Sequence, residues 1–314
     1  MKATSRLVGY GLVLGLALGG GLAVGDLFDT GPPAPTGGAE AGGDGQGTES
    51  ITGHEPAVKE EAPMGLSITS SEHRLVAETT QFEPGTPGEL RFRVAGPDGQ
   101  ALRAYDETHE RQLHLIVVSR DLGWFEHVHP ELEADGTWHQ PLTLPAAGPY
   151  RAYADFAPAG EDSLVLGIDL SAPGEYRPAE LPAVEAGDVV GDYTVTLTGN
   201  LVAGREAELG FNLERAGRPV TDLDPYLGAA GHLVALRAGD LAYLHVHPTS
   251  EDLGPEVRFA AHVPSAGAYR LFLDFSHGGV VRTAAFTVEA AAEPGQATTA
   301  PGGHQTGEAD EHSH

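Results

Sequence analysis

Apolar and polar residues alternate along short segments in the middle of the chain. Leu90, Phe92 and Val94 are separated by charged residues, and residues 209–213 repeat the alternation. A period of two is typical of a strand that buries one face. Further runs rich in β-branched or aromatic residues lie at 113–118, 193–197, 233–236 and 286–288. Turn signals separate these runs and no helical period is sustained, so the pattern predicts an all-β fold.

The middle of the chain is a tandem repeat. Ala-Gly-x-Tyr-Arg and Asp-Phe occur together at residues 147–156 and again at residues 266–275. The tetrapeptide His-Val-His-Pro at 127–130 recurs at 245–248. A near-constant offset of 118 or 119 residues indicates two copies of one domain. With about seven short strands in about 100 residues, each copy is predicted to be a β-sandwich of the immunoglobulin or cupredoxin type.

The N-terminal end differs in composition from the repeats. Lys2 and Arg6 precede an uncharged apolar run at residues 7–25, which is long enough to span a bilayer as a helix. Small residues at Ala23 and Gly25 fit the alternative of a cleaved signal peptide. The basic flank predicts that the rest of the chain lies outside the cytoplasmic membrane, either anchored to the cell membrane by a single pass or secreted.

These features divide the chain into six segments. They are a transmembrane anchor or signal peptide (1–25), a disordered acidic Gly/Pro-rich tether (26–63), a first β-sandwich (64–175), a linker (176–187), a second β-sandwich (188–289) and a disordered tail rich in His and acids (290–314). The expected fold class is therefore all-β, with two tandem immunoglobulin/cupredoxin-like sandwiches behind an N-terminal transmembrane helix and a tether.

Three histidines keep the same spacing in both copies. They are His114, His127 and His129 in the first copy and His232, His245 and His247 in the second. The last two of each set are two residues apart, so in a strand both side chains project from the same face. A turn within the preceding thirteen residues would fold the first histidine back beside them. Three imidazoles on one face are the ligands of a metal site, and the sequence predicts one such site in each copy.

Asp155 and Asp274 are the candidates for a fourth ligand, one in each copy. Each lies out of phase with the apolar residues of its strand, so its side chain leaves the core face. A carboxylate there would complete the coordination sphere or orient a ligand imidazole, and water is the alternative fourth ligand. The structural alternatives are a strand-end hydrogen bond or an ion pair with Arg151 or Arg270 for the aspartates, and an exposed polar face for the histidines.

Composition narrows the chemistry of these sites. The 314 residues include no Cys, which excludes thiolate metal sites and iron–sulfur clusters, and only two Met, which argues against a methionine-lined Cu(I) site. Imidazole and carboxylate ligands suit Cu(II) first, because it binds tightest in the general affinity order, and Zn(II) second. The formal net charge of −27 argues against nucleic-acid binding and would concentrate cations near the sites.

The segments around these histidines resemble a known group of proteins. Residues 113–122 with 125–130, and residues 224–234 with 244–248, carry a His…His-x-His-Pro module in each copy. In this module the chain is similar to exported bacterial heavy-metal-associated secreted proteins, across residues 66–288. The resemblance implies a role in metal homeostasis, with copper first. A looser similarity, in fold only, is to the periplasmic copper-resistance sandwiches.

These observations predict an extracytoplasmic metal-binding protein that acts in the sequestration or delivery of Cu(II) or Zn(II), or in resistance to them. The expected partners are the metal ions, the cytoplasmic membrane through the N-terminal anchor, and a metal transporter or exported metalloprotein. The sequence shows no serine elbow, phosphate-binding loop or paired-carboxylate motif, so the chain is not expected to be an enzyme. The alternatives are a metal-dependent enzyme at the same histidines and a metal-free interaction or adhesion module of tandem sandwiches.

Overall fold

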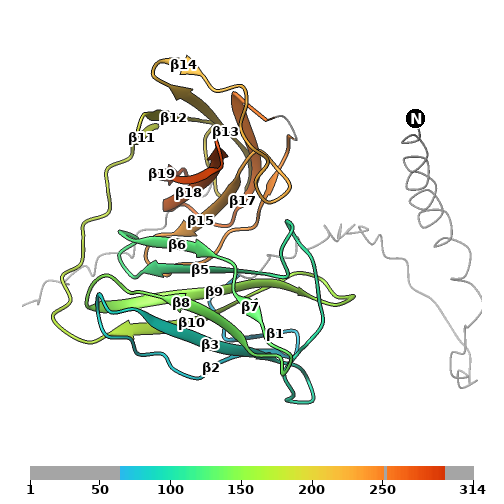
Figure 1. Cartoon of the computed structure of the whole chain (residues 1–314). Coiled ribbons are helices and arrows are strands. Elements are labelled where there is room, and N and C mark those ends of the chain that lie inside the picture. Colours follow the sequence, from blue (N-terminus) through green and yellow to red (C-terminus); the bar gives the residue numbers. More distant parts are fainter. Residues whose placement is uncertain (1–63, 251–252, 294–314) are drawn as a thin grey trace, which may run out of the picture. The chain divides into compact units, whose positions relative to one another are not determined.

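The computed structural model describes residues 64–250 and 253–293, which form strands, turns and loops and contain no helix (Figure 1). All of these residues belong to one compact unit. The all-β class predicted from the alternation is therefore confirmed for the described part of the chain. Among these residues no helix is long and apolar enough to cross a membrane. The predicted anchor (1–25), the tether (26–63) and residues 294–314 of the predicted tail lie outside the described residues.

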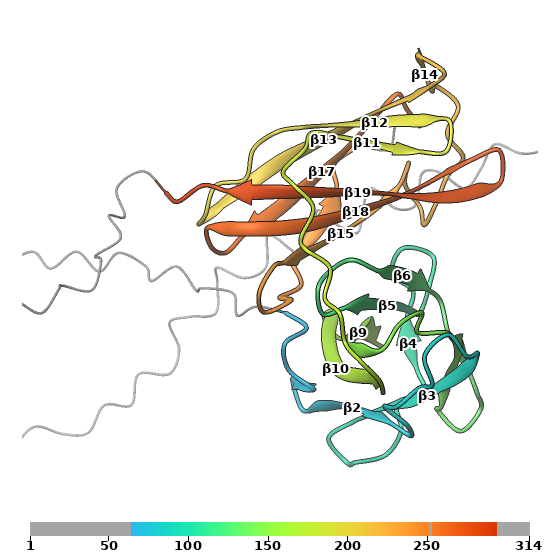
Figure 2. The same cartoon turned by 90° about the vertical axis from the view of Figure 1, so that its left-hand side faces the viewer.

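The first repeat is built from two antiparallel sheets (Figure 2). One sheet has the strand order β1 (Thr69–Ser70), β2 (His73–Ala77), β3 (Gly88–Ala95), β8 (Trp138–Leu142) and β7 (Glu131–Leu132). The other has the order β10 (Leu164–Ala172), β9 (Gly148–Pro158), β5 (Leu113–Ser119) and β6 (Phe125–Val128), and the short β4 (Tyr105–Asp106) pairs with β9. The two sheets enclose one hydrophobic cluster, to which Phe92 of β3 and Leu115 of β5 both contribute.

The second repeat also has two antiparallel sheets. One has the order β11 (Gly187–Val190), β12 (Tyr193–Thr198), β13 (Arg205–Arg215), β17 (Glu256–Val263) and β16 (Val246–Pro248), with β14 (Arg218–Pro219) paired to β13. The other has the order β15 (His232–Arg237), β18 (Gly267–His277) and β19 (Val280–Ala290). Phe211 of β13 and Leu271 of β18 are buried in the cluster that the two sheets share. Alternation therefore buries one face of each sheet in both repeats.

The two repeats differ in the strand that carries the His-x-His pair. In the first repeat β6 pairs with β5, so His127 stays in the same sheet as His114. In the second repeat β16 pairs with β17, which belongs to the sheet opposite β15. The equivalent of the β5–β6 hairpin is reduced to the bridge between Leu236 and Tyr243. The chain therefore crosses to the opposite sheet at different strands in the two repeats. In the first repeat the crossing occurs after β6, and β7 is the first strand on the other sheet, whereas in the second repeat β16 already belongs to the other sheet.

A third hydrophobic cluster joins the two repeats. Its buried members are Ile116, Val118, Leu122 and Tyr153 from the first repeat and Val234, Leu236, Leu241, Tyr243 and Phe272 from the second. At its edge the rings of Phe125 and Phe272 stack, with centroids 4.1 Å apart and planes at 7°. One face of β5 thus packs into the first sandwich and the other against the second repeat. This explains why every residue of β5 is buried and why its sequence is an almost continuous apolar run.

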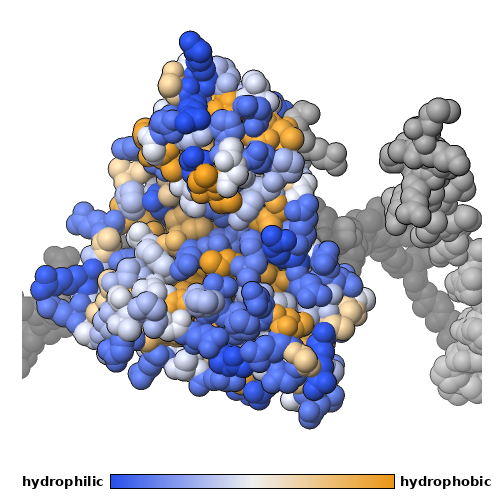
Figure 3. Space-filling model, in the orientation of Figure 1, coloured by the Kyte–Doolittle hydropathy of each residue, from blue (hydrophilic) through white to orange (hydrophobic). Residues whose placement is uncertain are grey.

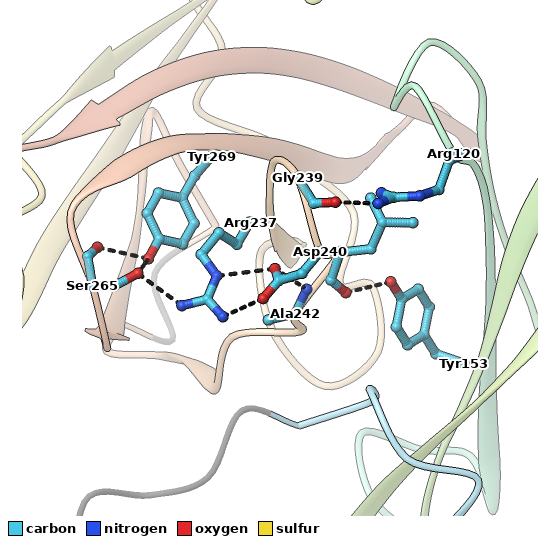
Figure 4. A network of polar contacts seen from close by, with 9 residues as sticks. Arg120, Tyr153, Arg237, Gly239, Asp240, Ala242, Ser265 and Tyr269 are labelled. Carbon is cyan, nitrogen blue, oxygen red and sulfur yellow. Dashed lines mark hydrogen bonds and ion pairs between the residues drawn. The ribbon is translucent and has the colours of Figure 1, made fainter. Parts of the chain in front are cut away.

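Polar contacts extend the junction between the repeats (Figure 4). The hydroxyl of Tyr153 on β9 donates a hydrogen bond to the carbonyl oxygen of Leu241 at 2.5 Å. The guanidinium of Arg120 donates to the carbonyl oxygen of Gly239 in the same turn. Within the second repeat, Asp240 forms an ion pair with Arg237 and orders this turn. The turn after β15 is therefore held against the first repeat by its own backbone carbonyl groups.

Candidate metal centre

The β5–β6 hairpin positions the three histidines of the first repeat. His127 lies opposite Ile116 in the ladder between the two strands. The turn is closed by a hydrogen bond from the amide of Ser119 to the carbonyl oxygen of Trp124 at 2.9 Å. This is the hairpin that the thirteen-residue spacing predicts, and it returns the His-x-His pair to the side of His114.

Ring nitrogens of these three histidines converge. Nδ1 of His114 lies 3.1 Å from Nε2 of His127 and 3.2 Å from Nε2 of His129. One nitrogen from each ring lies within 4.8 Å of the other two, so the three could face one ion. His114 is 1% exposed, and the side chain of His127 is also 1% exposed. The structure thus assembles the first predicted triad as one cluster, in which His129 is half-buried.

Acceptors on the far sides of two of these rings determine where their protons lie. Nε2 of His114 is 3.0 Å from the carbonyl oxygen of Thr108, and Nδ1 of His127 is 2.8 Å from Oδ2 of Asp274. Carbonyl and carboxylate oxygens only accept hydrogen bonds, so each of these two nitrogens carries a hydrogen. In the neutral rings, the remaining nitrogens of His114 and His127 each present a lone pair, and they face one another at 3.1 Å. Two lone pairs that face one another repel, and a cation between the two nitrogens, either a metal ion or a proton, would make this contact favourable.

Burial favours the neutral form of His114, His129 and His232. Desolvation, aided by neighbouring imidazoles, lowers the pKa of His114 to about 4 even though its hydrogen bond to Thr108 acts in the opposite direction. Desolvation and the two other rings lower the pKa of His129 to about 3. The same causes hold the pKa of His232 well below its ordinary value. Neutral imidazole is the form that binds a metal, so these rings are in their ligand form at neutral pH.

Asp274 reaches this cluster from the second repeat. It lies on β18, opposite His232 in the ladder, and is only 3% exposed. Its Oδ1 accepts a hydrogen bond from the hydroxyl of Thr283 at 2.5 Å, while Oδ2 accepts the hydrogen bond from His127. A carboxylate that orients an imidazole is one of the two roles predicted for this residue. The imidazole it contacts, however, belongs to the other copy.

His232 lies in the same cluster and apart from the other two histidines of its own copy. Its ring is parallel to that of His114, with centroids 5.2 Å apart and planes at 5°. His245 and His247 are exposed, and their ring centroids are 5.7 Å apart. Because β16 has joined the sheet opposite β15, the fold does not bring the second predicted triad together within the described residues.

Asp155 makes its hydrogen bond to a tyrosine and not to a histidine. It is opposite His114 in the β5–β9 ladder, and its Oδ2 accepts a hydrogen bond from the hydroxyl of Tyr243 at 3.4 Å. Burial raises the pKa of this carboxyl group to about 6, although the hydrogen bond from Tyr243 and the electrostatic interaction with His127 act to lower it. Its contact is therefore a hydrogen bond across the junction between the repeats, close to the structural alternative considered from the sequence.

The loop before β5 completes the surroundings of the cluster. His109 has a positive φ of 50°, and its ring centroid lies 5.5 Å from that of His232. A cavity of about 270 Å³ opens beside His129, with Glu107, Glu110 and Arg111 among its lining residues. Nothing in the repeat spacing points to His109 or Thr108, because neither belongs to the matched positions. Their proximity depends on the path of a loop, which no periodicity encodes.

The comparisons with known proteins identify a family but no activity. Residues 69–166 and 188–292 match one family, which is described as a domain of unknown function (DUF8832). No curated protein sequence matches the chain. The family matches correspond closely to the two repeats found from the offset.

Several solved structures are similar to the chain at low sequence identity. The Escherichia coli adhesin FdeC is 14% identical, and the match covers 72% of this chain and 66% of that chain with a TM-score of 0.23. Invasin, a bacterial integrin-binding protein, is 11% identical, and the match covers 71% of this chain and 39% of that chain with a TM-score of 0.22. Salmonella alpha-2-macroglobulin is 14% identical, and the match covers 74% of this chain and 15% of that chain with a TM-score of 0.26. The chain spans less than two thirds of the length of each. Similarities at this level carry no information about what this chain binds.

Proposed function

The chain belongs to the family described as a domain of unknown function (DUF8832), so its role has to come from its own geometry, and we propose that it is an extracytoplasmic metal-binding protein. The proposed site holds one Cu(II) or Zn(II) ion on His114, His127 and His129. The two repeats would be tandem sandwiches of the immunoglobulin or cupredoxin type. Sequestration or delivery of the metal is the proposed role, and a metal transporter or an exported metalloprotein is the proposed partner.

The observation that carries this proposal is the opposition of two lone pairs. Nδ1 of His114 and Nε2 of His127 are 3.1 Å apart, and the hydrogens of both rings are engaged elsewhere by Thr108 and Asp274. A metal ion bound by both nitrogens converts this repulsion into two coordinate bonds. A proton can occupy the same position, so metal affinity is expected to fall as the pH falls.

The donor set favours two metals. Imidazole nitrogens suit Cu(II) and Zn(II), and Cu(II) stands higher in the general affinity order. Glu107 and Glu110 beside the cavity at His129 supply negative charge on the side from which an ion could approach, while Arg111 partly offsets it. These features support binding of a divalent cation without specifying which of the two is carried.

A second candidate function is an interaction or adhesion module that needs no metal. Two β-sandwiches joined through a shared hydrophobic cluster form a scaffold that suits display of a binding surface. Such a module would present an exposed apolar patch. On the face drawn in Figure 3, hydrophobic residues lie in small separate groups among hydrophilic ones. We therefore place this function second and make it an outcome of the metal titration.

The test is a calorimetric titration of the full chain with Cu(II) and with Zn(II) at pH 7.5. The tail histidines His304, His312 and His314 are replaced by Gln in every sample, so that they cannot chelate the added metal. One ion per chain is expected, and His127→Gln should weaken binding at least about 100-fold, since loss of an outer-sphere partner alone typically costs 10–100-fold.

The matched control is the double variant His245→Gln, His247→Gln, which removes two exposed histidines with the same sequence motif. Its affinity should stay within about threefold of the parent chain, a change of less than about 0.7 kcal/mol. If the parent chain binds neither ion, the metal site does not exist and the interaction module becomes the leading function. Equal affinities of the parent and His127→Gln would refute the site assignment.

A further inference from the structure

The proposed metal site lies where the two repeats meet, and we infer that His232 of the second repeat is its fourth protein ligand, so that the ion clamps the repeats together. This inference rests on the proposed function, because it names the ligand and the mechanical consequence of the same ion. It changes the expectation from one site in each repeat to one site made by both.

His232 has a buried nitrogen with nothing to bind. Its Nε2 is inaccessible to solvent and has no hydrogen-bond partner, whereas His114 and His127 each have an acceptor on their outer side. Leaving a polar group buried and unpaired costs about 1–3 kcal/mol. Coordination to a metal ion would remove this cost.

The ring of His232 already contacts the ligand rings. Its centroid is 5.2 Å from that of His114 and 4.8 Å from that of His127. It stacks flat on His114, so it is outside the group of nitrogens that lie within 4.8 Å of one another. The ring must turn from this stacked position for one of its nitrogens to face the ion. Binding is therefore expected to change the contact between β15 and the first repeat.

Equivalent residues of the two repeats contact each other at the junction, as if related by a two-fold axis. A site at this junction can therefore take ligands from both repeats. Phe125 of the first repeat stacks on Phe272 of the second. By the repeat offset, Tyr243 is the equivalent of Phe125, and Tyr153 is the equivalent of Phe272. The rings of Tyr243 and Tyr153 also meet across the junction, with centroids 5.5 Å apart. Equivalent surfaces of the two copies therefore face each other, as in an isologous dimer. His114 and His232, which are also equivalent, meet face to face in this junction.

Asp274 provides a second contact from the second repeat to the histidines of the first. Its carboxylate belongs to β18 of the second repeat and accepts the hydrogen bond of His127 in the first. A metal ion on His127 makes that N–H more acidic and so strengthens the hydrogen bond to the carboxylate. Metal binding would thus reinforce the junction through both the ligand His232 and the orienting group Asp274.

The test compares the parent chain and His232→Gln, both with the tail histidines replaced, by calorimetry and by amide hydrogen exchange with and without Zn(II). The clamp predicts that the variant binds Zn(II) at least about tenfold more weakly. It also predicts that Zn(II) slows amide exchange in β15 of the parent chain and has a much smaller effect in the variant. His262→Gln, which removes an exposed histidine of β17, is the matched control and should behave as the parent does.

A second measurement does not depend on a variant. The electron paramagnetic resonance spectrum of the Cu(II)-loaded parent chain should show splitting from four ligand nitrogens, against three for a site made by the first repeat alone. Four nitrogens and weaker binding by the variant support the clamp. Three nitrogens, or unchanged affinity and β15 protection in His232→Gln, overturn the clamp but leave the proposed function intact. No binding by the parent chain overturns both.

Discussion

Hydrogen bonds on the outer sides of His114 and His127 determine what their inner nitrogens can do. The carbonyl oxygen of Thr108 and the carboxylate of Asp274 each take one N–H, which leaves a lone pair on the inner side of each ring. Metal-binding histidines are commonly oriented in this way by acceptors on their second nitrogen. The chemistry of the site thus depends on two groups that would not themselves touch the ion.

Replacing Asp274 by Asn tests this orienting role. The amide lacks the negative charge of the carboxylate and so accepts the N–H of His127 less strongly, and metal affinity is expected to fall about 10–100-fold. Isothermal calorimetry with Zn(II) at pH 7.5 measures the change. Asp155→Asn is the matched control, because its carboxylate accepts a hydrogen bond from Tyr243 instead of from a histidine, and its affinity should fall by much less than that of Asp274→Asn. Comparable losses in both variants would contradict the orienting role.

Asp155 is expected to make the stability of the metal-free protein depend on pH. Burial raises its pKa to about 6 from the usual 3.8, so the folded state holds this proton more tightly than the unfolded state does. The corresponding stability is fully present below about pH 4 and is lost as the pH rises through about 6. Asp155→Asn remains uncharged, so it should exceed the parent by about 2–3 kcal/mol in free energy of unfolding at pH 7.5 and equal it at pH 4.

Urea unfolding in the presence of a chelator at both pH values measures this difference. The comparison between parent and variant cancels the titration of the other carboxylates and histidines. A difference of the same size at pH 4 and pH 7.5 would show that burial of the charge is not its cause.

At the scale of elements, one change of strand pairing separates the two copies. β6 pairs with β5, while β16 pairs with β17 across the sandwich. Alternation along a strand fixes the face of the sheet from which a side chain projects, but the sheet that the strand joins determines which histidines lie near that side chain. The same junction buries the outward faces of β5 and β15 against each other, so the apolar run of β5 serves two clusters.

Phe272→Ala tests the packing of these elements. The ring is 4% exposed and stacks on Phe125, so its removal leaves a cavity in the cluster that joins the repeats. A loss of about 3–5 kcal/mol in the free energy of unfolding is expected. Val280→Ala on β19, where the side chain is 51% exposed, should change it by less than about 0.5 kcal/mol. Chemical denaturation of both variants distinguishes them, and similar small losses would mean that the junction contributes little.

At the scale of the whole molecule, the described residues form one compact unit in which two sandwiches share a hydrophobic cluster and a histidine cluster. The chain carries a formal net charge of −27, which favours cation binding in general but does not select a site. The proposed site is distinguished by the convergence of imidazoles at the junction of the repeats. Metal binding and the stability of the whole unit are therefore expected to be coupled.

This coupling is measurable as a shift in thermal unfolding. A free metal concentration of about 100 times the Kd adds about 2.7 kcal/mol to the free energy of unfolding. For a domain pair of this size, the Tm should rise by roughly 5–10 °C in scanning calorimetry with Zn(II). The His127→Gln variant, with the tail histidines replaced, should show no such rise at the same concentration. A rise of equal size in both proteins would place the bound metal elsewhere.

Local patterns were sufficient for much of this architecture. The alternation at Leu90, Phe92 and Val94 predicts a strand with one buried face, and all three residues are buried in β3. The thirteen-residue spacing predicts the hairpin that gathers the first triad, and the offset of the repeats locates two similar sandwiches. Each of these is a property of neighbouring residues, so a single sequence carries it.

The contacts between the copies were beyond the reach of such patterns. Equal spacing predicts equal sites, yet His247 lies on the sheet opposite His232, with His245 just before its strand, because β16 pairs with β17. The pairing of Asp274 with His127 joins positions 147 residues apart in different repeats. The sequence alone determined the all-β class, the duplication and the identity of the histidines, because these follow from local periodicity and composition. Only the tertiary structure decided which histidines meet, because that depends on the packing of one repeat against the other.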